Sequence, residues 1–239
     1  MKLYITLFTI LMMAIPGAMG AKRDKANEKI TAKVWFKDGH TYEGELVKHW
    51  LTRRQTYPAS GHNFHIKADS GDKSIKCEVS DTDSILITSS THPDFQAGDF
   101  YVALNTNKKD NPIGGGRAAH KMLKREYAGR NVEFCKLTYI GNCMIGNNNM
   151  DQWMEWWMLR FCESGQVVIF FSNPLEKGCN KPRFTGGMSE IAKFNPALAD
   201  ALVERFSSKD KKERNEIAGT IQENPLLYVD FIDNYLTDK

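Results

Sequence analysis

The fold is decided by the stretch WMEWWMLRFCESGQVVIFF, residues 153–171. Two apolar runs flank a short polar turn at residues 163–165, which is the pattern of a β-hairpin. Side chains alternate between the two faces of a strand, so Trp153 and Trp157 fall on one face of the first run and Trp156 falls on the other. Because large apolar residues occupy both faces, we expect a central hairpin that is covered on both sides.

The first twenty residues have the pattern of a cleaved secretory signal peptide. Lys2 supplies a positive start, residues 3–15 are almost entirely apolar, and small residues precede a polar segment that begins after Gly20. The apolar run is too short to span a bilayer comfortably, and no later run is long enough for a second span. We expect cleavage of residues 1–20 and a soluble product without a membrane span, either periplasmic or secreted.

Composition narrows the class of protein. The chain of 239 residues is 41% hydrophobic and 26% charged, which is ordinary for a globular protein, and its net charge is only +3. Nucleic-acid-binding proteins normally carry a marked basic excess on one face, so no nucleic-acid partner is expected. The five cysteines show no CxxC spacing, which gives no signal of a zinc or redox motif, and their pairing stays open.

About five short strands, separated by turn signals, are predicted in the first part of the mature chain. In the segment VWFKDGHTYEGEL, residues 34–46, an Asp-Gly turn joins two strands and a glycine marks a bend in the second. This segment, followed by Phe64-x-Ile66 and a closing segment at 79–85, resembles the SH3-like or Sm-like small barrel. The resemblance implies a bent β-barrel over residues 28–90, of a kind that often holds peptides or other proteins.

Residues 95–239 are expected to form a second module. Apolar alternation predicts strands at 99–104 and 131–140 that accompany the hairpin, while residues 117–127 have helical character that Gly129 can end. Asparagine–proline pairs and a helical apolar period predict three closing helices, at 196–206, 209–222 and 225–236. The predicted fold class is therefore α+β: a small bent β-barrel followed by an antiparallel sheet module with C-terminal helices.

The whole layout is similar to a group of exported proteins of unknown function that are common in Bacteroidetes. The resemblance rests on the signal peptide, the Lys-Asp-Gly turn, the segment GRNVE at residues 129–133, the aromatic hairpin and the closing helices. It implies export and carries no particular activity.

Four aromatic residues are the candidate binding residues: Trp153, Trp156, Trp157 and Tyr139. Packing in the core is favoured for the tryptophans, and a platform for stacking a sugar or binding a peptide is the functional alternative. A tryptophan exposed beside Tyr139 or Tyr101 would favour the platform.

No metal or cofactor site is expected. His62 and His65 have the spacing of a ligand pair, but residues three apart on a strand point to opposite faces. The glycine-rich segment 114–116 ahead of His120 suggests a phosphate-binding loop at the start of a helix. Because a Walker-type ending is absent, an ordinary loop before a solvated helix is favoured.

No pattern in the chain is a catalytic signature. Cys179 is the best-placed thiol, since neighbouring lysines would lower its pKa, but no sequence feature supplies a partnered base. Asp151, Glu155 and Glu163 surround the hairpin and are the carboxylates that a glycosidase-like pair would use. We therefore expect a non-enzymatic binding module of the cell envelope or exterior, whose partner is a protein, peptide or glycan. The alternatives are an envelope hydrolase that acts on glycan or peptide, and a self-assembling structural subunit.

Overall fold

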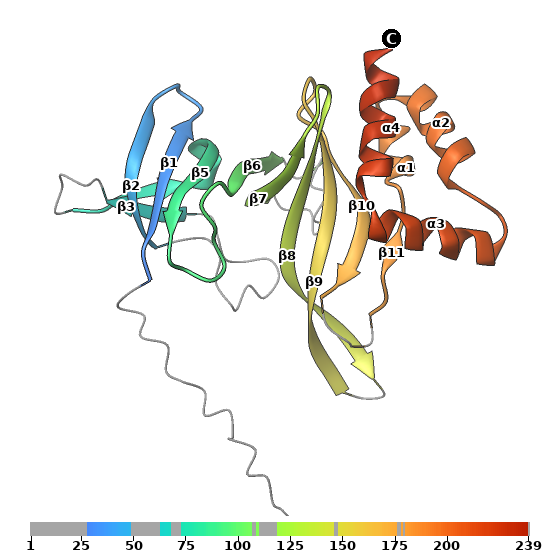
Figure 1. The fold of residues 1–239 in the computed structure, drawn as a ribbon, viewed down its shortest axis with the longest axis horizontal. Coiled ribbons are helices and arrows are strands. Elements are labelled where there is room, and N and C mark those ends of the chain that lie inside the picture. The colour runs from blue at the N-terminus through green and yellow to red at the C-terminus, as the bar shows by residue number, and fades with distance from the viewer. Residues whose placement is uncertain are drawn as a thin grey trace, which may run out of the picture.

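The structure is a computed structural model that describes residues 28–48, 63–67, 73–106, 109, 119–145, 148–175, 178 and 180–238. The expected leader, residues 1–20, lies outside the described part of the chain. Within that part, eleven strands form a single antiparallel sheet and four α-helices follow at the C-terminal end (Figure 1). The predicted α+β class is confirmed.

The first half of the sheet has the spatial order β5-β1-β2-β3-β4. Its strands are β1 (Ile30–Phe36), β2 (Thr41–Lys48), β3 (Asn63–Lys67), β4 (Ile75–Glu78) and β5 (Thr82–Ser90). The predicted Asp-Gly turn joins β1 to β2, with Gly39 at a φ of 90° that glycine adopts without strain. Alternate residues of these strands bury one apolar core, which includes Val34, Phe64 and Ile85 at 0% exposure.

The barrel expected over residues 28–90 does not close. One edge of β5 pairs with β1, and the other pairs with β6 (Phe100–Thr106) from Ser84 to Leu86. Because both edges of β5 are hydrogen-bonded there, β4 cannot complete a ring with it, and among the described residues β4 pairs with β3 alone. The sheet instead runs on into the second half, across the boundary expected between residues 90 and 95.

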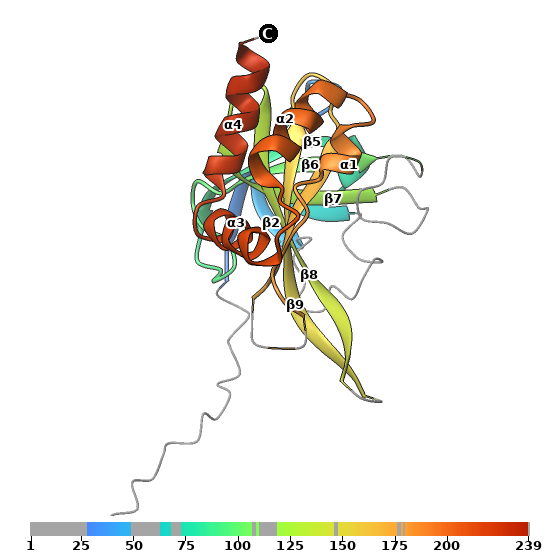
Figure 2. The same ribbon diagram turned by 90° about the vertical axis from the view of Figure 1, so that its right-hand side faces the viewer.

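The second half of the sheet contains the predicted aromatic hairpin. Its strands are β7 (Ala119–Ala128), β8 (Val132–Ile145), β9 (Asn148–Phe161), β10 (Val167–Pro174) and the short β11 (Arg183–Phe184). The hairpin is confirmed as β9 and β10, which pair from Arg160 and Val167 onward around a turn that contains Gly165 at a φ of 67°. Figures 1 and 2 show the β8–β9 ribbon projecting beyond the neighbouring strands.

The prediction of a helix over residues 117–127 is wrong, because the described part of this segment belongs to strand β7. It pairs with β6 from Ala119 to Arg125 and with β8 from Lys124 to Ala128. Backbone hydrogen bonds on two sides of the strand override the local helical preference of its residues.

The hairpin is covered on both faces, as expected. On one face, Trp157, Leu159 and Phe161 share a core with the helices. On the other face, Met158 shares a core with residues of β6, β7 and β8, including Leu104, Leu123, Cys135 and Leu137. Strand β9 therefore carries buried apolar side chains on both of its faces.

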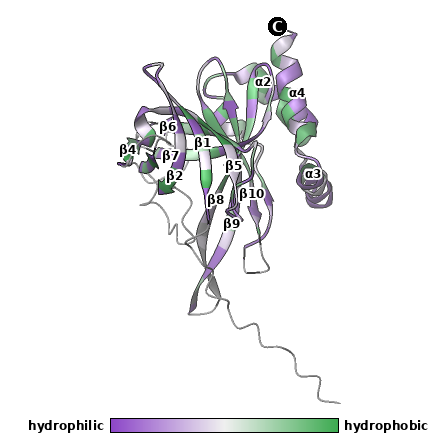
Figure 3. Ribbon diagram, turned by 60° about the vertical axis from the view of Figure 1, so that its left-hand side comes forward, coloured by the Kyte–Doolittle hydropathy of each residue, from purple (hydrophilic) through white to green (hydrophobic). Residues whose placement is uncertain are grey.

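The helices are α1 (Met188–Ile191), α2 (Pro196–Phe206), α3 (Lys211–Glu223) and α4 (Leu226–Thr237). Asn195 caps α2 as predicted, since its side chain accepts from the Leu198 amide at 3.1 Å. Asp210 caps α3 in the same way, at 2.9 Å from the Glu213 amide. The α3 helix is mostly hydrophilic (Figure 3), and Ile221 is its buried contact. None of the described helices has both the length and the hydrophobicity that crossing a bilayer requires.

Hydrogen bonds to Asp233 join α4 to the β7–β8 turn, where the GRNVE segment lies, and we call this contact the clasp. The Asp233 carboxylate on α4 accepts from the backbone amides of Arg130, Asn131 and Val132 at 3.0, 2.6 and 3.1 Å. The Asn131 side chain donates in return to the Asp233 carbonyl at 3.1 Å. A Cβ on Gly129 would lie 2.8 Å from the Asp233 carboxyl carbon, so glycine is needed for this approach.

Replacing Asp233 with alanine should lower the free energy of unfolding by about 2 kcal/mol, because three amides lose a charged acceptor. Asp238→Ala is the matched control, since Asp238 is exposed at the end of the same helix. Urea unfolding followed by circular dichroism measures both variants. Equal midpoints for the two variants would show that the clasp does not hold the helix in place.

Candidate functional site

The four aromatic residues predicted to bind a ligand are divided between the two faces of β9. Trp157 is 5% exposed and stacks on Phe171, with ring centroids 4.7 Å apart. Its indole N–H donates to the Glu155 carboxylate. Trp153 is half-buried and lies on the same face by register, since the β8–β9 pairing has no shift. Because Trp157 is buried and shares a core cluster with residues of α1, α2 and α4, it is part of the core beneath the helices.

Trp156 and Tyr139 lie together on the opposite face. Both are half-buried, and their ring centroids are 4.1 Å apart at an interplanar angle of 42°. One tryptophan thus lies partly exposed beside Tyr139, which is the arrangement that favours a binding platform. The two rings are packed on each other, however, so each gives one of its faces to its neighbour and the pair offers no single flat surface.

The surroundings of this aromatic pair are tightly filled. A Cβ on Gly141 would lie 2.9 Å from the Met154 side chain and 3.4 Å from the Tyr139 ring. Gln152 is 3% exposed and accepts from the Asn180 amide at 3.0 Å. Close packing on this side indicates that the pair stabilises the base of the β8–β9 ribbon.

The three carboxylates considered for glycosidase chemistry are not brought together. Asp151 and Glu163 lie near opposite ends of β9, and both are exposed. Glu155 accepts from the Trp157 indole and lies 3.9 Å from the Lys136 ammonium. Asp151 and Glu155 are four positions apart on one strand, about 13 Å between Cα atoms, so they do not face each other across a cleft as a glycosidase pair does.

The candidate metal ligands, the candidate phosphate-binding loop and the candidate thiol nucleophile either lie in strands or fall outside the described residues. His62, residues 114–116 and Cys179 lie outside them. His65 is a half-buried residue of β3, and the His120 ring contacts the Asn105 side chain at 3.0 Å across β6 and β7. His120 therefore lies on a strand rather than at the start of a helix. Within the described ranges no group of three histidine, cysteine or acidic residues could hold a metal ion.

The thiols that the structure describes are not activated. Burial raises the pKa of Cys77 to about 11, and the Glu78 charge adds to this effect. Burial also raises the pKa of Cys135, with a further contribution from Glu133. Cys162 is exposed, yet partial burial and Glu133 again raise its pKa. A nucleophilic thiol requires the opposite shift.

A charged cluster at the end of the second face is internally satisfied. Glu133 is 7% exposed, and its two carboxylate oxygens accept from Arg125 at 2.8 Å and Arg160 at 2.7 Å. The Arg125 guanidinium also lies over the Phe100 ring, 3.8 Å from its centroid. This cluster joins β6, β7, β8 and β9, and both oxygens of its buried carboxylate are paired.

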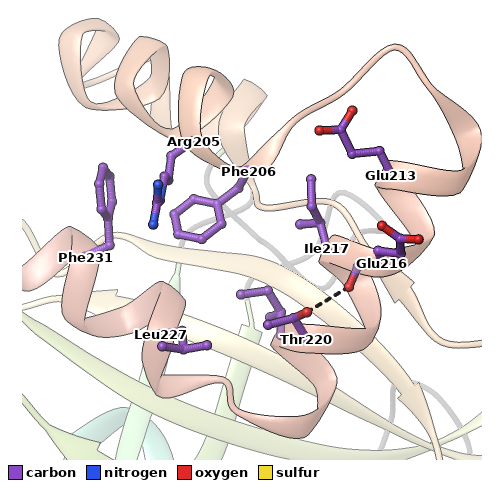
Figure 4. A pocket seen from close by; sticks show the side chains of 9 residues that line it. Arg205, Phe206, Glu213, Glu216, Ile217, Thr220, Leu227 and Phe231 are labelled. Carbon is purple, nitrogen blue, oxygen red and sulfur yellow. Dashed lines mark hydrogen bonds between the residues drawn. The ribbon is translucent and has the colours of Figure 1, made fainter.

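A groove of about 360 Å³ lies among α2, α3 and α4. Its lining is Arg205, Phe206, Glu213, Glu216, Ile217, Thr220, Ile221, Leu227 and Phe231 (Figure 4). Phe206 is held edge-on by the rings of Tyr228 and Phe231, at centroid distances of 4.9 and 5.3 Å. Leu227 remains 48% exposed. The groove therefore combines a fixed aromatic floor with an accessible apolar rim.

Charges are separated across the groove. Figure 4 shows Arg205 beside Phe231 on one side and Glu213 with Glu216 on the other, with the Phe206 ring between them. The Thr220 hydroxyl donates to the Glu216 carbonyl at 2.9 Å, so it is occupied within α3. The apolar centre of the groove is therefore flanked by a cation on one side and by carboxylates on the other.

Sequence reasoning missed this groove. It assigned the apolar positions of the closing helices to stripes that pack on the sheet, and Ile221, Val229 and Ile232 are indeed buried. Leu227 and Phe231, however, are one helical turn apart on α4 and lie off the Val229–Ile232 stripe. A second apolar stripe on one helix was the available signal.

Comparison with protein-family models, with curated proteins and with solved structures finds no match for this chain.

Replacing Glu133 with glutamine should lower the free energy of unfolding by about 2–4 kcal/mol, because two partly buried arginines would face each other without a counter-charge. Glu163→Gln, in the exposed hairpin turn, is the matched control and should change stability by about 0.5 kcal/mol or less. Chemical denaturation with and without 0.5 M NaCl measures both. Unchanged stability of Glu133→Gln would mean that the cluster is solvated rather than structural.

Proposed function

We propose that this protein is a non-enzymatic interaction module of the cell envelope or exterior, and that the groove among α2, α3 and α4 binds an apolar segment of a partner protein. The observation that carries the proposal is Leu227, which stays 48% exposed on the rim of a groove floored by Phe206 and Phe231. Covering a half-exposed leucine contributes about 1 kcal/mol, so such a rim favours association.

The groove is suited to a peptide because its walls are preformed. Phe206, Tyr228 and Phe231 fix one another by edge-to-face contacts, so little side-chain freedom is lost when a ligand enters. Grooves between helices commonly receive an extended or helical apolar segment through a few anchor residues.

Export to the periplasm or exterior belongs to the same proposal and is supported by the leader pattern of residues 1–20. The relation of residues 28–90 to SH3-like or Sm-like barrels is likewise proposed, and it is supported by the five antiparallel strands that supply most of one apolar core.

The groove can be tested with a display library of random twelve-residue peptides selected on the purified protein. We expect apolar peptides to be enriched and to bind Leu227→Gln at least about tenfold more weakly than the wild type, because loss of an apolar anchor commonly costs more than 1 kcal/mol. Glutamine keeps the helical propensity of this position, so the variant should fold.

Leu175→Gln is the matched control, since Leu175 is 49% exposed after β10 and lies outside the groove lining. It should bind the selected peptides as the wild type does in fluorescence anisotropy. Enrichment of no peptide above background, or equal loss in both variants, would refute binding at the groove.

Export predicts a defined N-terminus. Expression of the full chain in a Gram-negative host should give a processed product that begins at Ala21, because cleavage follows the small residue Gly20. N-terminal sequencing of the periplasmic and medium fractions checks this. Recovery of the chain from the cytosol with Met1 intact would contradict export.

A further inference from the structure

We propose that the segment bound in the groove is dipolar, with an apolar centre, a carboxylate that pairs with Arg205 at one end and a cationic group that meets Glu213 and Glu216 at the other. This inference rests on the proposed function, because it specifies the chemistry of the partner that the same groove would bind. The observation that carries it is the placement of Arg205 on one side of the groove and of Glu213 and Glu216 on the other.

Arg205 is the cation that a ligand would meet. It is exposed in the last turn of α2, and among the described residues no carboxylate lies within ion-pair distance of it. A cation in this position also interacts favourably with the helix dipole, which explains its place on α2. Among the described residues, the guanidinium of Arg205 donates no hydrogen bond, and its planar set of donors matches the geometry of a carboxylate.

The apolar neighbours of Arg205 strengthen such a pair. Phe206 and Phe231 line the groove beside it, and a ligand that covers these rings would exclude water from the same place. A charge pair gains strength as water is excluded, because the local dielectric falls. A carboxylate flanked by apolar side chains would therefore bind more tightly than a free acid.

The opposite side of the groove is acidic and accessible. Glu213 accepts a hydrogen bond from the Ser208 hydroxyl. Glu216 lies 3.9 Å from Lys212, but the two side chains are 65% and 88% exposed, so water screens this pair. Both carboxylates can accept a further cation. A segment of uniform negative charge would be repelled there, and one of uniform positive charge would be repelled by Arg205.

Four synthetic peptides with one shared apolar core test the inference. They carry an aspartate at one end and a lysine at the other, the aspartate alone, the lysine alone, or glutamine at both ends. Isothermal titration calorimetry should give the tightest binding for the dipolar peptide and the weakest for the neutral one. Raising NaCl from 50 to 500 mM should weaken the dipolar peptide and leave the neutral peptide unchanged.

Variants of the protein test whether Arg205 is the cation that pairs with the aspartate of the peptide. Arg205→Gln should weaken the aspartate-bearing peptides about five- to tenfold and leave the neutral peptide unaffected. Arg205→Glu should reverse the preference between the aspartate-only and lysine-only peptides. Arg130→Gln is the matched control, because Arg130 is exposed in the β7–β8 turn and lies outside the groove lining.

The outcomes separate this inference from the proposed function. If all four peptides bind equally to the wild type and to Arg205→Gln, the groove binds apolar segments but the dipolar partner is refuted. If none of the four peptides binds and no library peptide is enriched, both the proposed binding at the groove and the dipolar partner are refuted. If the wild type is a dimer by sedimentation and Leu227→Gln is a monomer, a second copy occupies the groove and the dipolar peptide is again refuted.

Discussion

The ladder between β8 and β9 runs without a register shift from the pair Val132 and Phe161 to the pair Ile145 and Asn148. A slip of one residue would exchange the faces of every side chain on β9. Trp157 would then leave the core beneath the helices, and the opposite core would lose Met158. The helix layer and the apolar core shared by β6, β7, β8 and β9 both depend on this register, because each takes its residues from one face of β9.

The parts of the fold that the sequence predicts are those with local causes. Alternation within residues 153–171 predicts the hairpin and the division of its tryptophans between two faces, and Asn195 predicts the start of α2. Strand β7 was predicted as a helix, because its partners β6 and β8 supply the decisive hydrogen bonds and no local pattern reveals them. Barrel closure was wrong for the same reason, since the competitor for the edge of β5 is a later strand.

In the candidate site, too, the sequence predicts the features with local causes and misses those that depend on tertiary packing. Pattern reasoning named Trp156 and Tyr139 as candidate binding residues but could not show that their rings pack together on one face. The groove depends on the relative positions of three helices, which no single periodic pattern contains. Arg205 and Leu227 are ordinary surface residues in the sequence, and only the packing of α2 against α4 gives them a shared environment.

The contact between Asp233 and the β7–β8 turn joins residues that are 102 positions apart in the chain. Contacts of such long sequence separation form late, because a large loop must close before they stabilise the fold. Neighbouring strands such as β8 and β9 pair over a much shorter distance along the chain, so the sheet of the second half can form before α4 docks on it.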